Sequence, residues 1–160
     1  MVRIIEHNQV DSSILSQIVE IKKLSWNYSI EEHLRWMTVN LTDTDLHLMI
    51  YENNELIAYL NFVRVCVLSN NKSIPCLGIG NVCTKYKGQG DGKKLMNEAN
   101  AFLLESGSRG LLFCKKSLVD FYLKNQWHLI QNLHPNLEIN TMVFNFNNLD
   151  SDLKYNQRLF

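Results

Sequence analysis

The apolar positions nearest the N-terminus predict a strand followed by a helix. Residues 2–6 (VRIIE) form a short apolar-rich run of the kind found in strands. Residues 11–24 predict a helix, because apolar side chains recur every three or four positions, at Ile14, Ile18 and Ile21. Asp11, Ser12 and Ser13 stand just before this stripe and can cap the first turn.

A second helix is predicted directly after Ser29. Ser29 and Glu32 have the spacing of a capping box, in which each side chain bonds the other residue's backbone N–H. Apolar residues then recur at helical spacing, at Ile30, Leu34 and Met37. We expect this stripe to face the core.

From residue 46 the pattern changes to runs of β-branched and aromatic residues. Residues 46–52 and 56–68 are separated by Asn53–Asn54–Glu55 and predict a hairpin. A turn over 69–73 (SNNKS) leads into a further predicted strand, residues 74–84.

In the C-terminal half, segments with the helical spacing of apolar residues alternate with segments typical of strands. Residues 91–105 predict a helix, with Leu95, Ala99, Phe102 and Leu103 on one side and Gly107 as its C-cap. The remaining predicted elements are a strand at 111–114, a helix from Ser117 through Asn125, and strands within 127–131 and 141–146.

The predicted order is β-α-α-β-β-β-α-β-α-β-β. Antiparallel hairpins come first and a strand–helix–strand crossover follows, which predicts an α/β fold with a mixed sheet and helices packed on it. We expect one domain over residues 1–146 and a polar C-terminal tail over 147–160.

Composition narrows the class of protein. Sixteen basic residues balance sixteen acidic ones, which argues against a nucleic-acid or membrane-surface binder. The longest apolar runs fall short of the roughly 20 residues that a membrane span needs. The four cysteines show neither a C-x-x-C pair nor metal-ligand spacing. We expect free structural thiols, no metal site and a cytoplasmic protein.

Five of the seven glycines lie between Gly78 and Gly92. A P-loop would need glycine where this chain has Lys87, and a dinucleotide fingerprint would need it where Lys93 stands. What remains is a strand, a turn with alternating glycines, and a helix start. Such a turn is either a flexible connection or a cradle whose N–H groups bind an anion, and the flanking lysines favour the cradle.

Two segments resemble one family. Residues 87–92 (KGQGDG) are similar to the acetyl-CoA signature of the GCN5-related N-acetyltransferases (GNAT), and residues 121–127 (FYLKNQW) resemble a later segment of that family. The element order also matches the family fold. The resemblance covers residues 1–146 and implies transfer of an acetyl group from acetyl-CoA to an amine.

The resemblance also implies site residues. Those expected to bind acetyl-CoA are Val82, Cys83, Thr84, Lys87, Gly88, Gln89, Gly90, Asp91, Gly92 and Lys93. The cofactor's amide-containing arm can pair with the edge of strand 74–84, and an N–H near Val82 can stabilise the thioester oxyanion. Tyr122 is the implied proton donor to the departing thiolate.

The amine must lose a proton before it attacks, yet strand 74–84 contains neither Asp nor Glu. A water held by Asn81 can relay this proton, or an acid such as Glu31 or Glu32 can take it. The aromatic residues Trp26, Tyr28 and Trp36 either bind a cationic acceptor by cation–π contact or pack the first helices.

Three functions follow from these residues. The first is an N-acetyltransferase, monomeric or homodimeric, whose acceptor is a primary amine of a small molecule or peptide. The second is a non-catalytic acyl-CoA-binding module, supported by Asp91 beside the turn and by the missing strand carboxylate. The third is thiol catalysis through Cys83 or Cys114.

Overall fold

The computed structural model describes every residue except 137, 147–152, 156 and 158–159. The strands are β1 (Val2–Glu6), β2 (Leu46–Glu52), β3 (Glu55–Ser69), β4 (Lys72–Thr84), β5 (Gly110–Lys115), β6 (His128–Ile130), β7 (Ile139–Phe144) and β8 (Leu153–Lys154). The α-helices are α1 (Ser12–Lys23), α2 (Ile30–Asn40), α3 (Asp91–Glu105) and α4 (Val119–Lys124), and two 3-10 turns cover His7–Gln9 and Lys116–Leu118.

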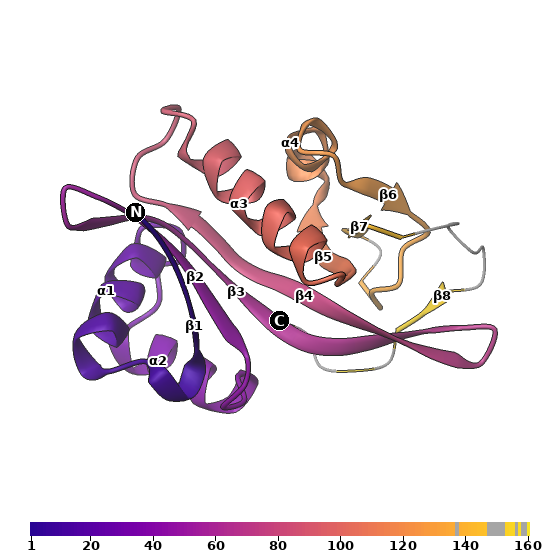
Figure 1. The fold of residues 1–160 in the computed structure, drawn as a ribbon, viewed down its shortest axis with the longest axis horizontal. Helices are drawn as coiled ribbons and strands as arrows, with labels where there is room; N and C mark the ends of the chain where they lie inside the picture. Colours follow the sequence, from indigo (N-terminus) through magenta and orange to yellow (C-terminus); the bar gives the residue numbers. More distant parts are fainter. Residues whose placement is uncertain (137, 147–152, 156, 158–159) are drawn as a thin grey trace. The chain divides into compact units, whose positions relative to one another are not determined.

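The strands form the predicted mixed sheet. Their hydrogen-bonding order is β1-β2-β3-β4-β5-β7-β6, and β8 pairs with β3. β4 and β5 are parallel, whereas β1–β2, β2–β3 and β5–β7 are antiparallel. The predicted α/β class and the predicted order of the main elements are therefore confirmed (Figure 1).

The described residues fall into two compact units. The first contains Met1–Val63, Gly80–Glu98 and Phe160, and the second contains Arg64–Ile79 and Ala99–Leu159. β3 and β4 therefore contribute residues to both units.

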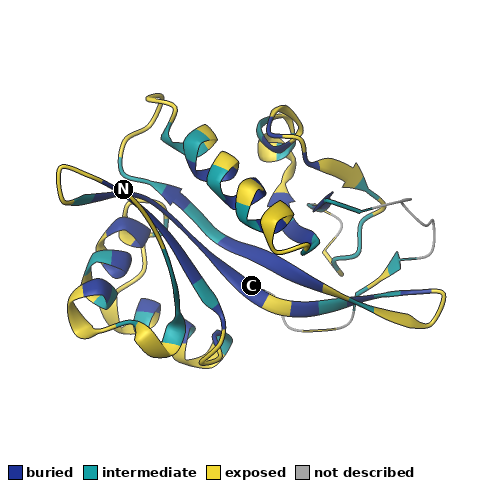
Figure 2. Cartoon of the chain, viewed as in Figure 1, coloured by how far each residue is buried: buried dark blue, intermediate teal, exposed yellow. Residues whose placement is uncertain are grey.

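In the first unit, α1 forms as its periodicity predicts. Ile14, Ile18 and Ile21 are all at most 5% exposed. Asp11 is the N-cap, and its Oδ1 accepts a hydrogen bond from the Ile14 N–H at 2.8 Å. Figure 2 shows the same division of α1 into a buried and an exposed side.

The capping box of α2 is confirmed, but its buried face is only partly the predicted one. The Glu32 N–H donates to Ser29 Oγ at 3.2 Å, and the Ser29 N–H donates to Glu32 Oε2 at 2.7 Å. Met37 is buried as expected, whereas Ile30 is 45% exposed and His33 is only 2% exposed. His33 can be buried because its ring nitrogen finds a main-chain partner, which a hydrophobicity pattern does not reveal.

Both early hairpin turns have the geometry that asparagine tolerates better than most residues. Asn53 and Asn54 have φ of 49° and 65°, and Asn70 and Asn71 have φ of 48° and 60°. These left-handed residues account for the tight β2–β3 and β3–β4 connections that the sequence predicts.

The second unit packs around Trp127, which is 1% exposed. Its indole Nε1 donates to Asn100 Oδ1 at 2.9 Å. A side chain on Gly110 would meet the Trp127 ring at 2.5 Å, so this close approach requires glycine. The predicted C-cap of α3 is confirmed, since Gly107 has φ of 64°.

The short helix of this unit begins later than predicted. Ser117 lies in a 3-10 turn, and α4 starts at Val119 after Leu118, which provides no side-chain cap. The Ser117–Asp120 spacing therefore does not mark a cap here. Sequence spacing alone cannot distinguish a 3-10 turn from the first turn of an α-helix.

The predicted tail lies partly outside the described residues, which exclude 147–152, 156 and 158–159. Its described part contains β8, which the sequence did not predict. Leu153 and Lys154 pair with Ser69 and Leu68 of β3.

The state of the cysteines and the character of the helices complete the description of the fold. All four cysteines are free thiols, as expected. Among the helices of the described residues, none has the length and apolar character needed to cross a bilayer.

Candidate active site

The glycine turn after β4 is an exposed loop with left-handed backbone (Figure 2). Gly88 has φ of 79° and Gly90 has φ of 87°, and a Cβ at either would lie in open space. These two glycines are therefore needed for backbone conformation, as predicted. Gly92 differs: it lies within α3 and does not have a positive φ.

The start of α3 supplies unused donors next to this turn. Its first helical hydrogen bond runs from the Lys94 N–H to the Gly90 carbonyl at 3.0 Å. The N–H groups of the preceding helical residues therefore have no acceptor within the helix. These N–H groups and the positive end of the helix dipole favour an anion at this position.

The lysines around the turn divide into two pairs. Lys85 and Lys94 form ion pairs with Glu55 and Glu52, whereas Lys87 and Lys93 are exposed. The paired lysines anchor the turn to the β2–β3 hairpin. Lys87 and Lys93 are the ones positioned to meet an anion from solvent.

β4 offers main-chain groups that β5 does not use. The β4–β5 ladder recorded for the described residues covers only Leu77–Ile79. The strand continues through Thr84, and Asn81 within it has φ of 54°. The left-handed conformation of Asn81 interrupts the extended strand, so the backbone of residues 80–84 does not continue the regular conformation of the segment paired with β5.

The predicted acetyl-CoA residues all lie in the first unit. Cys83 is buried; those of intermediate exposure are Val82, Thr84, Asp91 and Gly92; those exposed are Lys87, Gly88, Gln89, Gly90 and Lys93. The structure therefore brings them together as one strand end, turn and helix start.

Asn81 contacts a residue that the sequence did not single out. Its Nδ2 donates to Asn61 Oδ1 at 2.6 Å. Asn61 is 0% exposed, and its own Nδ2 has no hydrogen-bond partner in the described part of the protein. A polar residue inside the apolar run 56–68 was the only sequence signal for Asn61.

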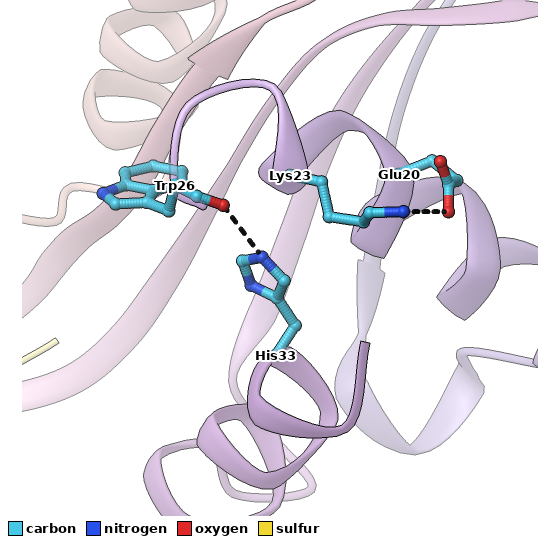
Figure 3. A network of polar contacts seen from close by, with 4 residues as sticks. All are labelled: Glu20, Lys23, Trp26 and His33. Atoms are coloured by element: carbon cyan, nitrogen blue, oxygen red, sulfur yellow. Dashed lines mark hydrogen bonds and ion pairs between the residues drawn. The ribbon is translucent and has the colours of Figure 1, made fainter. Parts of the chain in front are cut away.

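The predicted acceptor residues Trp26, Tyr28 and Trp36 come from the α1–α2 region. Figure 3 shows the Trp26 carbonyl pointing at His33 while the indole ring points away; the His33 Nε2–Trp26 O distance is 3.3 Å. Tyr28 is 57% exposed and lies edge-on to His33. The contact between His33 and the Trp26 carbonyl therefore holds the main chain of the α1–α2 loop in place. The side chains of Trp26 and Tyr28 take no part in that hydrogen bond.

A cation already lies over Trp36. Lys22 Nζ is 4.3 Å from the ring centroid, although Lys22 is only 2% exposed. Burial lowers the pKa of Lys22 to about 8, while burial raises the pKa of the neighbouring Cys83 thiol to about 12. Lys22 was missed because a lysine at a helix end ordinarily faces solvent.

Tyr122 belongs to the second unit. It is 5% exposed and packs edge-on against Phe121 and Trp127. Burial, followed by the charge of Cys114, raises its pKa well above the usual value. The hydroxyl therefore keeps its proton at neutral pH, as a donor must, and its catalytic role stays a prediction.

The turn after Tyr122 has a conformation suited to glycine. Gln126 has φ of 69°, and the Trp127 N–H donates to the Tyr122 carbonyl at 3.1 Å. Gln126 thus adopts a left-handed backbone despite its side chain.

Of the two candidate acids, Glu32 has a structural role. Its carboxylate accepts the Ser29 N–H, and this hydrogen bond lowers its pKa. Glu31 is exposed on the same helix.

Comparison with known proteins identifies the fold. No family model matches the sequence, and no curated protein matches it. Escherichia coli ElaA has a similar structure, with a TM-score of 0.66 and 16% identity over 89% of this chain and 97% of that chain. An acyl-CoA N-acyltransferase from Pseudomonas aeruginosa gives a TM-score of 0.66 with 17% identity over 89% and 97% of the two chains.

A third similar structure is the Campylobacter jejuni N-acetyltransferase PseH in complex with acetyl coenzyme A, with a TM-score of 0.61 and 16% identity over 90% and 98%. The chain therefore has the acyl-CoA N-acyltransferase fold. More particularly, its fold is that of the GCN5-related N-acetyltransferases, as the sequence resemblance indicated.

Proposed function

We propose that the protein is an acetyl-CoA-dependent N-acetyltransferase whose acceptor is a primary amine of a small molecule or peptide. The observation that carries this proposal is the left-handed turn at Gly88 and Gly90, which leads directly into the first N–H groups of α3, which have no acceptor within the helix. The fold and the PseH complex support the same function.

The residues present fit acetyl-CoA. The N–H groups of the turn and of the first turn of α3 would hold the pyrophosphate, with Lys87 and Lys93 adding positive charge. The main chain of β4 beyond Ile79 would pair with the amide-containing arm as a neighbouring strand does. Asp91 fits if its carboxylate points to solvent, since an acid at a helix N-terminus is favourable in itself.

When bound, acetyl-CoA supplies the activated acetyl group. The Val82 N–H would donate to the thioester oxygen as charge develops there. Asn81 would hold a water that accepts the proton of the acceptor amine, because an alkylammonium with a pKa of about 10.4 is unreactive. Tyr122 would donate a proton to the departing thiolate.

The acceptor would bind near α1 and α2, where Trp26, Tyr28 and Trp36 lie. An aminoglycoside 6'-N-acetyltransferase complexed with coenzyme A has a similar structure, with a TM-score of 0.62 and 13% identity. This supports a small-molecule acceptor, such as an amino sugar, aminoglycoside, polyamine or amino acid. We propose a cytoplasmic enzyme, monomeric or homodimeric, with no nucleic-acid or membrane partner.

One observation favours a second function. β4 contains neither Asp nor Glu, so a non-catalytic acyl-CoA-binding module would bind acetyl-CoA without transferring it. Turnover separates the two functions.

The test measures free CoA release from acetyl-CoA in the presence of a panel of primary amines, with calorimetry of CoA binding in parallel. We expect binding and amine-dependent turnover, and loss of both in Gly90→Asp. Binding without turnover of any amine would favour the module, and failure to bind CoA would refute both functions.

A further inference from the structure

Asn61 has a buried amide group that is only half satisfied. Its Oδ1 accepts the Asn81 Nδ2–H at 2.6 Å, while its own Nδ2 has no partner among the described residues. Leaving a buried donor unpaired destabilises the folded state. Native proteins retain few such groups, and a ligand that completes the pairing is one reason for keeping one.

The unpaired amide lies against the main chain of β4. A Cβ on Gly80 would stand 3.4 Å from both Asn61 Nδ2 and Asn61 Oδ1. Gly80 is the first residue of β4 after the segment paired with β5. Because Gly80 has no side chain, the Asn61 side-chain amide lies next to the main chain of β4. This is the segment beyond Ile79 that we propose binds the arm of acetyl-CoA.

The space beside Gly80 is occupied by main chain in this structure, and an extended ligand such as the acetyl thioester arm would take the place of that main chain. The backbone carbonyl carbon of Phe160 lies 2.8 Å from the Cβ position of Gly80, in the same unit. A main-chain group therefore reaches this point in the structure. The acetyl thioester and its amide-containing arm are about as slender as a polypeptide main chain.

Asn81 fixes the direction of the Asn61 amide. Its φ of 54° turns it out of the regular strand, and its Nδ2 takes the Asn61 oxygen as acceptor. The Asn61 nitrogen is thereby left for another acceptor. Asn81 is thus a positioning residue for Asn61, in addition to the water-holding role proposed above.

We propose that Asn61 Nδ2 donates a hydrogen bond to the thioester carbonyl oxygen of bound acetyl-CoA, and that this donor stabilises the oxyanion of acetyl transfer. The amine nitrogen forms a bond to the carbonyl carbon, and the C=O electron pair moves to the oxygen that Asn61 contacts. When the C=O bond re-forms, the C–S bond breaks, the thiolate leaves and takes up a proton, and the amine proton goes to water. This inference rests on the proposed function.

The donor would act mainly in the transition state, because the carbonyl oxygen gains charge as the amine attacks. Removal of one such donor lowers kcat by about 10²–10³-fold in other acyl-transfer enzymes. We expect a similar loss for Asn61→Leu, with the affinity for CoA changed less than about threefold. Asn81→Gly keeps a residue suited to positive φ but removes both the bond that orients Asn61 and the amide proposed to hold the relay water, so we expect a loss of at least roughly tenfold.

Thermal unfolding distinguishes this role from a structural one. Asn61→Leu removes the buried Nδ2 donor, which has no partner among the described residues, together with the acceptor of the Asn81 Nδ2–H. Because Asn81 is of intermediate exposure, its amide can bind water instead, so the Tm should change little. Asn100→Leu is the matched control, because Asn100 pairs with both Trp127 Nε1 and the Asn125 carbonyl. That variant should unfold at a clearly lower temperature.

The decisive measurement does not require an acceptor. Acetyl-CoA labelled with ¹³C at the thioester carbonyl is bound to the wild-type protein and to Asn61→Leu, and the C=O stretch is recorded by difference infrared spectroscopy. We expect a lower frequency in the wild type than in the variant, since a hydrogen bond weakens the C=O bond. Equal frequencies, an unchanged kcat, or a loss of CoA binding in Asn61→Leu would each overturn the assignment.

The experiment gives different results if the proposed acetyltransferase function is wrong and if only the role of Asn61 is wrong. If the wild-type protein binds acetyl-CoA but acetylates no amine, the frequency difference still tests the hydrogen bond by itself. If the wild-type protein does not bind acetyl-CoA, the assignment of Asn61 is refuted together with the cofactor site.

Discussion

Replacing Lys22 with methionine should stabilise the fold at neutral pH. Burial lowers the pKa of Lys22 from 10.5 to about 8, which corresponds to about 3 kcal/mol for keeping the charged amine in the core at pH 7. The contact of Nζ with Trp36 offsets roughly 1–2 kcal/mol of this cost. Methionine keeps the apolar stem and a similar helix propensity, so Lys22→Met should raise the free energy of unfolding by about 1–2 kcal/mol.

The pH dependence has a defined sign. Below about pH 8 the lysine is charged in both states, so the cost of burying the charge is fully present. Between pH 8 and 10.5 the folded lysine loses its proton while the unfolded one keeps it, so wild-type stability rises relative to the variant. Both proteins also lose stability above pH 9, because Cys83 has a raised pKa of about 12 when folded and the unfolded thiol ionises first.

The assay is urea unfolding of both proteins at several pH values between 7 and 10, reported as the difference at each pH. Lys23→Met is the matched control: Lys23 is the next residue of α1, with a partly exposed side chain 3.3 Å from Glu20 (Figure 3), and should change stability by less than about 0.5 kcal/mol. A Lys22→Met variant less stable than wild type by 1 kcal/mol or more at pH 7 would refute this reasoning.

Three further predictions test the site and its supports. Gly90→Asp should abolish CoA binding in calorimetry, because it combines a strained φ of 87° with negative charge at the cradle; Gly107→Ala, at φ of 64° outside the cradle, should lower stability but leave binding unchanged. Tyr122→Phe should lower kcat roughly 10²-fold at constant acetyl-CoA affinity, and wild-type turnover would assign Tyr122 to packing alone. Gln126→Gly should raise the free energy of unfolding by about 0.5–1 kcal/mol in thermal melts, since glycine adopts its φ of 69° without strain; a loss of stability would contradict this.

The fold was largely predictable because its elements have strong local signals. The stripe Ile14, Ile18 and Ile21 and the Ser29–Glu32 capping box both form as expected. The errors occur where tertiary contacts override the pattern. His33 is buried in place of Ile30 because the Trp26 carbonyl, in the loop before α2, lies within reach of its ring. A main-chain carbonyl leaves no trace in hydrophobic periodicity.

The conformation of the glycine turn was also largely predictable, because alternating glycines suggest positive φ, although Gly92 does not adopt it. Gly88 and Gly90 have the positive φ that their spacing suggests. Asn61 and Lys22 were not predictable in the same way. Their significance depends on which groups from other elements surround them, Asn81 and Gly80 in one case and Trp36 in the other.

Buried polar residues whose side-chain atoms are all hydrogen-bonded stabilise this protein, whereas one with an unbonded atom is available to a ligand. Asn100 uses both its oxygen and its nitrogen, and His47 lies between His7 and Tyr59 at 3.0 and 2.8 Å. Such groups recover by hydrogen bonding what burial costs them, so removing them should lower stability. Asn61 leaves its Nδ2 donor beside Gly80 without a partner among the residues that the structure describes. Although its removal also takes away the acceptor of Asn81 Nδ2, it should lower activity far more than stability, and this difference makes the two roles separable by experiment.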